Sequence, residues 1–116
     1  MNMDSFTKGQ RREICRLAGL AHERELSTAA GSLESEFGRW RRGEIDVFEL
    51  NEHIHKFHDG VSRELYKAYA MGRPEFSVAG AIVRRVLKES EVDPAILEGL
   101  RRLIELGRET EQENEA

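Results

Sequence analysis

The fold class follows from residues 46–70, which read DVFELNEHIHKFHDGVSRELYKAYA. Apolar side chains recur in this stretch every three or four residues, which places them on one face of an α-helix. That face consists of Val47, Leu50, Ile54, Phe57, Val61, Leu65 and Ala68. Asp46, with Glu49 three residues later, has the pattern of a capping box at a helix start. We therefore predict one helix over residues 47–71, with Gly60 as the position of a kink.

The residues before this stretch predict a long N-terminal helix over 6–42. Its apolar residues form two faces, Ile14, Leu17, Ala18 and Ala21 on the first, and Leu26, Ala30, Leu33, Phe37 and Trp40 on the second. At about 100° per residue the two faces differ by about 120°. The change falls within residues 22–28, so the helix is either bent there or broken into two, and both alternatives stay open. Gly43 suits the end of this helix.

Two further helices are expected after Gly72. One is predicted over residues 77–89, with Ser77 as its N-cap. Asp93-Pro94 is a strong start signal for the last helix, because Pro is favoured at the first helical position. The segment from residue 108 to 116 is rich in Glu and has no apolar anchor before its terminal Ala, which predicts a disordered acidic tail.

These elements predict an all-α fold, a small helical bundle of four to five helices with a long N-terminal helix. The domain boundaries are expected at 1–107 for a single helical domain and 108–116 for the tail. A chain of 116 residues is long enough for one such domain.

Composition excludes several classes of function. The single cysteine, Cys15, can form neither an internal disulfide nor a Cys-based zinc site, which favours a reducing compartment. No apolar run reaches the roughly 18 residues of a membrane span, and the N-terminus lacks the pattern of a secretory signal. We therefore expect a cytoplasmic protein without a membrane partner.

The charge distribution argues against a dedicated nucleic-acid binder. The formal net charge is −4, whereas such proteins usually carry a clear basic excess. The one basic cluster with an aromatic residue is Arg39-Trp40-Arg41-Arg42. A nucleic-acid-contacting regulator is therefore kept only as a second alternative.

The segment that could carry chemistry is residues 52–59, which hold three of the four histidines. Glu52 and His55 have the Glu-x-x-His spacing of di-iron bundles, but a second such motif is missing. On a helical wheel the histidines do not all converge, and His55, His58 and Asp59 remain the compatible metal ligands. The candidate functional surface is Glu52, His55, His58, Asp59 and Arg63. The alternatives are a weak metal-binding or His/carboxylate catalytic site, or solvated side chains that flank the core.

No complete catalytic constellation or phosphate-binding loop is found, so we expect no cofactor and do not predict an enzyme. A continuous helix of about 35 residues would span about 52 Å. That exceeds the radius of gyration of about 13 Å for a compact domain of this size, so part of its apolar face would need a partner. The predicted interface is Leu26, Leu33, Phe37 and Trp40, and a homodimer or a protein partner is expected.

Four short segments support a resemblance: WRRGEI at 40–45, EL at 49–50, IHKFHDG at 54–60 and RELY at 63–66. Together they resemble a segment of small uncharacterised bacterial helical proteins that have no assigned function. The resemblance implies a bacterial cytoplasmic protein and implies no reaction or ligand. The sequence thus predicts an intracellular helical self-association or protein-interaction module.

Overall fold

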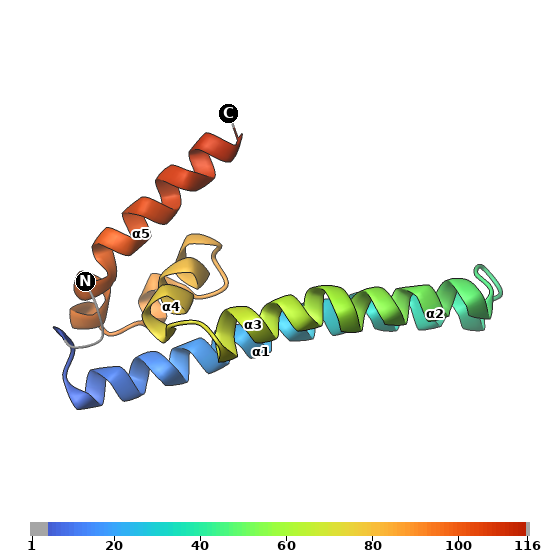
Figure 1. Cartoon of the computed structure of the whole chain (residues 1–116), viewed down its shortest axis with the longest axis horizontal. Helices are drawn as coiled ribbons and strands as arrows, with labels where there is room; N and C mark the ends of the chain where they lie inside the picture. Colours follow the sequence, from blue (N-terminus) through green and yellow to red (C-terminus); the bar gives the residue numbers. More distant parts are fainter. Residues whose placement is uncertain (1–4, 116) are drawn as a thin grey trace. The chain divides into compact units, whose positions relative to one another are not determined.

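The computed structural model describes residues 5–115, and every regular element in them is helical (Figure 1). The elements are α1 (Lys8–Arg41), α2 (Val47–Lys56), the π-helical segment η2 (Phe57–Ser62), α3 (Arg63–Ala70), α4 (Pro74–Val83), the 3-10 turn η3 (Glu89–Glu91) and α5 (Pro94–Glu115). Because α2, η2 and α3 follow one another without a break, they form one helical arm, which we call the second arm. The predicted all-α fold with a long N-terminal helix is confirmed. None of the described helices is long and apolar enough to cross a membrane.

The first helix is continuous, which decides between the two alternatives for residues 6–42. It starts with a capping box: the backbone N–H of Gln10 donates to Thr7 Oγ1 at 3.1 Å, and that of Thr7 donates to Gln10 Oε1 at 2.9 Å. It ends at Arg41, and Gly43, the residue predicted to suit its end, follows with a φ of 76°. The N–H of Glu44 donates to the Arg39 carbonyl at 2.9 Å, which is the long bond of a Schellman motif.

The second arm also begins where the sequence predicts. Asp46 is the N-cap, and its side chain accepts a hydrogen bond from the Glu49 N–H at 2.8 Å. Ile45 and Leu50 are both buried, and they occupy the two positions of a hydrophobic staple, one before the cap and one in the first turn. Cap and staple together fix how the chain turns from α1 into α2.

The described residues group into two compact units. Unit 1 holds the chain up to Ala21 and from Gly72 onward, and unit 2 is the segment from His22 to Met71. Unit 2 is a helical hairpin, in which the second half of α1 lies beside the second arm and runs antiparallel to it (Figure 1). The single domain expected over 1–107 stays a prediction.

Unit 1 contains most of the buried apolar side chains. They come from the N-terminal part of the chain up to Ala21, from α4 and α5 and from the connection between these two helices. The largest that are fully buried are Ile14, Leu17, Val78, Leu87, Ile96 and Leu100. Asp93 Oδ1 accepts from the Ala95 N–H at 2.8 Å, so the predicted start of the last helix is confirmed. This unit therefore supplies the conventional core of the fold.

Two predicted elements in unit 1 have different bounds in the structure. The helix predicted over 77–89 with Ser77 as its cap is α4, which starts at Pro74 with Arg73 as N-cap and already ends at Val83. The physical reason is that Pro is already set for the first helical position, three residues before Ser77. The segment predicted as disordered also differs, because α5 continues to Glu115. Its Glu and Gln residues have high helix propensity, which extends the helix without apolar anchors.

Replacing Gly99 in α5 with Ala should destabilise the protein. A Cβ there would lie 2.5 Å from Cε1 of Phe6, a ring that is itself buried. We expect a loss of about 1–3 kcal/mol in the free energy of unfolding, measured by urea denaturation. Gly31→Ala in α1 is the matched control, since nothing lies within 4 Å of its added Cβ. Helix propensity should make that variant more stable by about 0.5–1 kcal/mol. Equal gains in the free energy of unfolding for both variants would contradict the close approach of Phe6 to Gly99.

Arg85 should be replaceable by Gly with a gain in stability. Arg85 has a φ of 64°, in the left-handed region, and follows the end of α4 just as Gly43 follows the end of α1. A residue with a Cβ pays about 1–2 kcal/mol for this conformation, which Gly avoids. We expect Arg85→Gly to raise the midpoint of thermal unfolding and Gly43→Ala to lower it. A decrease for Arg85→Gly would mean that the Arg side chain contributes more than the strain costs.

Candidate functional site

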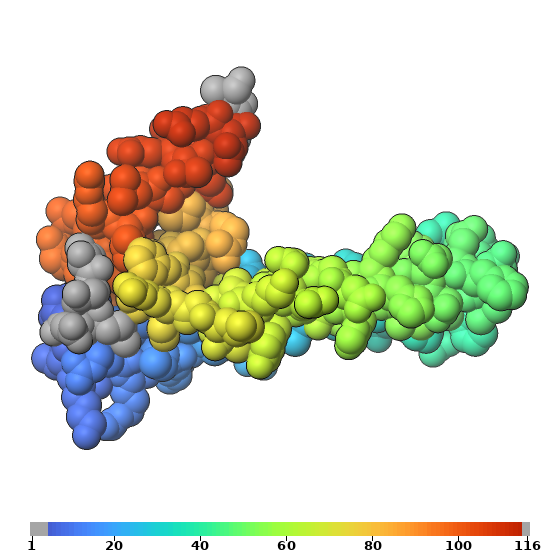
Figure 2. Space-filling view, viewed as in Figure 1, coloured from blue at the N-terminus to red at the C-terminus, as the bar shows by residue number. Residues whose placement is uncertain are grey.

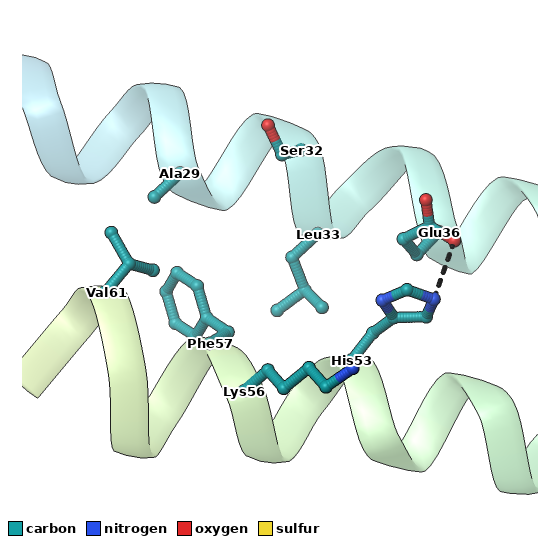
Figure 3. Close-up of a pocket in the computed structure, with 8 residues that line it drawn as sticks. All are labelled: Ala29, Ser32, Leu33, Glu36, His53, Lys56, Phe57 and Val61. Atoms are coloured by element: carbon teal, nitrogen blue, oxygen red, sulfur yellow. Dashed lines mark ion pairs between the residues drawn. The ribbon is translucent and has the colours of Figure 1, made fainter.

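The hairpin of unit 2 carries a groove along the boundary between its two helical arms (Figure 3). The groove has a volume of about 350 Å³ and is lined by Ala29, Ser32, Leu33 and Glu36 of α1 and by His53, Lys56, Phe57 and Val61 of the second arm. The α1 residues are spaced three, one and three apart, which places them on one face of the helix. We call this feature the hairpin groove.

One end of the hairpin groove is apolar and the other is charged. Leu33 and Phe57 lie on opposite walls, with the short side chain of Ala29 and with Val61 beyond them (Figure 3). At the other end His53 Nε2 lies 3.2 Å from Glu36 Oε2. The groove is therefore an amphipathic surface with a histidine–carboxylate contact at one end.

Glu36 holds the charged end together. Besides His53 it contacts Arg39, whose Nη1 donates to Glu36 Oε2 at 3.0 Å. The side chains of His53 and Glu36 are 36% and 21% exposed, so both are partly withdrawn from water. A carboxylate that orients an imidazole is one part of a nucleophilic catalytic site, which also needs a nucleophile within reach of the ring. The only hydroxyl among the lining residues is that of Ser32, and no contact between it and His53 is observed. The arrangement is suited to recognition through packing and charge.

The π-helical segment Phe57–Ser62 changes the register of the second arm. In a π-helix each N–H bonds to the carbonyl five residues earlier instead of four, so this segment shifts the helical register by one residue. The half-buried positions from here onward are Phe57, Gly60, Ser62 and Leu65. Val61 is instead 42% exposed, and Ala68 is exposed. The apolar stripe predicted through Asp59-Gly60 without a change of phase is therefore wrong at Val61 and Ala68. It is also wrong at its first residue, because Val47 is 51% exposed.

Beyond the π segment the new register brings Tyr69 to the inner face of the hairpin. Tyr69 is buried, and its ring stacks on that of His22 with centroids 5.1 Å apart and an interplanar angle of 9°. Its hydroxyl donates to Glu25 Oε2 at 2.8 Å. This polar cluster links α1 to α3 inside unit 2.

The structure places the predicted functional surface in solvent. Glu52, His55, His58, Asp59 and Arg63 are all exposed. His58 Nδ1 and Asp59 Oδ1 lie 3.1 Å apart, with side chains that are 83% and 69% exposed. Within residues 5–115 no three His, Cys, Asp or Glu side chains are grouped so that they could hold a metal ion. Of the predicted ligands His55, His58 and Asp59, only His58 and Asp59 contact each other.

The predicted interface residues differ in how far the hairpin covers them. Leu26, Leu33 and Phe37 are half-buried, and Trp40 is 40% exposed. Leu33 lies in the hairpin groove opposite Phe57, so part of this stripe packs within the chain itself (Figure 3). The stripe remains incompletely covered along its length.

Sequence reasoning missed the pairing of Glu36 with His53 and the contacts of Tyr69. A signal for the first existed, because His53 flanks the apolar stripe of its helix and Glu36 flanks that of α1. Two residues at the edges of facing stripes meet when the helices pack antiparallel. No comparable signal in the sequence predicts the contacts of Tyr69, because its position depends on the π segment.

No family model, curated protein or solved structure that was compared matches this chain.

Deleting Gly60 should separate Tyr69 from His22. Loss of one residue would convert the π segment to a regular α-helix and rotate everything after it by about 100°. We expect the ring-current shifts of the His22 side chain, measured by NMR, to disappear in this variant.

Gly60→Ala is the matched control, because nothing lies within 4 Å of its added Cβ and the residue count is kept. It should retain the His22 shifts. If the deletion variant folds and also keeps them, the π segment does not set the position of Tyr69.

Proposed function

We propose that this chain is a helical self-association module that assembles through the hairpin of unit 2. The observation that supports the proposal is the lack of a closed core there. Among residues 22–71 only Ile45, Leu50 and Tyr69 are buried. Two helices meet along a single line, and a helix normally buries a stripe about 100° wide. The hairpin therefore leaves part of each stripe to be covered from outside.

The side chains left in this state are apolar and extend along both arms. Those that are half-buried are Leu26, Ala29, Leu33, Phe37, Ile54, Phe57 and Leu65. Phe48 is 78% exposed, Tyr66 58% and Val47 51%. Figure 2 shows this part of the chain as a narrow rod. Covering apolar surface contributes about 25 cal/mol per Å², which favours association of such a rod.

A second copy of the chain is the partner that the dimensions favour. A four-helix bundle is built from four helices of similar length, packed nearly antiparallel around a shared core. Two hairpins supply those four helices in matched lengths. A twofold symmetric pair also closes, so that assembly stops at the dimer.

The basic cluster gives less support to nucleic-acid contact. Arg39 is paired with Glu36, and Arg42 Nε lies 2.5 Å from Glu44 Oε2. These pairs neutralise two of the three arginines that would contact phosphates. The exposed thiol of Cys15 suits a reducing compartment, which supports a cytoplasmic setting.

Association through the hairpin can be measured by native mass spectrometry together with hydrogen exchange at increasing protein concentration. We expect a dimer, and we expect amide protection to rise with concentration in residues 22–71 while α4 and α5 show no such rise. The α4 and α5 amides are the internal control, because they lie in the other unit. A monomer at every concentration would refute the proposal, as would concentration-dependent protection confined to α5.

A further inference from the structure

We infer that the hairpin groove is the seam of the dimer, covered by the same groove of a second copy of the chain. The inference rests on the proposed function and names the surface through which it acts. It is carried by the shape of the groove, by the distribution of its charges and by the unpaired side chain of Lys56.

The two walls of the groove are unequal at its apolar end, beyond the facing pair Leu33 and Phe57. There the α1 wall presents the short side chain of Ala29, while the second arm presents Val61 (Figure 3). The groove as a whole has an open volume of about 350 Å³. A twofold axis would set the large wall of each copy against the small wall of the other, so that Val61 enters the space above Ala29. A self-complementary patch of this kind is what an isologous interface requires.

The distribution of charges in the groove also favours a second copy of the chain as the partner. The groove contains one carboxylate, Glu36, on the α1 wall, and one ammonium group, Lys56, on the second arm. Glu36 already pairs with His53, whereas Lys56 has no ion pair with any residue that the structure describes. Twofold symmetry would bring Lys56 of each copy toward Glu36 of the other and form the pair twice. A nucleic acid or a strongly charged peptide would find cation and anion side by side and gain little.

Filling the groove tests whether it is covered. Ala29→Arg places a long cation in the groove, and Ala30→Arg places the same side chain at the adjacent exposed position of the same helix. Both substitutions suit a helix, and circular dichroism would confirm that the fold is retained. We expect the dissociation constant of the dimer to rise about 100-fold for Ala29→Arg, as for an unpaired charge in an interface core, and by less than about threefold for Ala30→Arg.

The outcomes separate this inference from the proposed function. If Ala29→Arg remains as dimeric as the natural chain, self-association stands and the seam is elsewhere. If Ala30→Arg dissociates while Ala29→Arg does not, the hairpin assembles through the opposite face and the inference is overturned. If the natural chain is itself monomeric, both proposals fail.

Charge exchange tests the twofold arrangement. Lys56→Glu alone would set like charges against each other twice in a homodimer, and so would Glu36→Lys alone. Each should weaken its homodimer about tenfold. Mixing the two variants restores opposite charges across both contacts. With one variant labelled uniformly with 15N so that the three dimers differ in mass, native mass spectrometry should find the mixed dimer well above half of all dimers. A statistical mixture would overturn the pairing and with it the seam.

Discussion

The constraint on which unit 2 depends is that two helices cannot enclose a core. Each helix of the hairpin has an apolar stripe, and the single line of contact between them covers one edge of each stripe. The consequence is visible residue by residue: Leu33 and Phe57 face each other across the hairpin groove, yet both remain half-buried. Polar side chains such as Glu36 and His53 lie at the stripe edges. In the dimer that we propose, the uncovered apolar stripes supply the driving force for association, and these edge residues select the partner.

The π segment is the second determinant of the hairpin. By adding one residue between Phe57 and Ser62 it turns α3 relative to α2, and Tyr69 reaches His22 and Glu25. The same turn leaves Val61 at the edge of the groove, where it is 42% exposed. A regular helix would have buried Val61 between the arms and directed Tyr69 away from them. The one inserted residue therefore has two effects: it brings Tyr69 into contact with α1 at one end of the hairpin, and it leaves Val61 partly exposed at the groove.

The parts of the fold that the sequence predicts correctly are those with local causes. The cap at Asp46, the end of α1 at Gly43 and the start of α5 at Pro94 each depend on residues within a few positions of one another. The continuity of α1 could not be decided, because its two apolar faces fit a bent helix and a broken one equally well. The groove could not be predicted either, since Glu36 and His53 meet only after the hairpin closes.

The histidines show how the two kinds of information differ. Spacing alone favoured His55 and His58, since they lie within reach of carboxylates along one helix, yet both are exposed. In the structure the histidine that contacts a carboxylate of the other arm is His53. Spacing along one helix could not single it out, because its partner Glu36 lies on α1. His53 and Glu36 hold each other in place at the charged end of the apolar groove. In the dimer that we propose, such a rim would contribute more to the choice and alignment of the partner than to the strength of binding, which the apolar walls would supply.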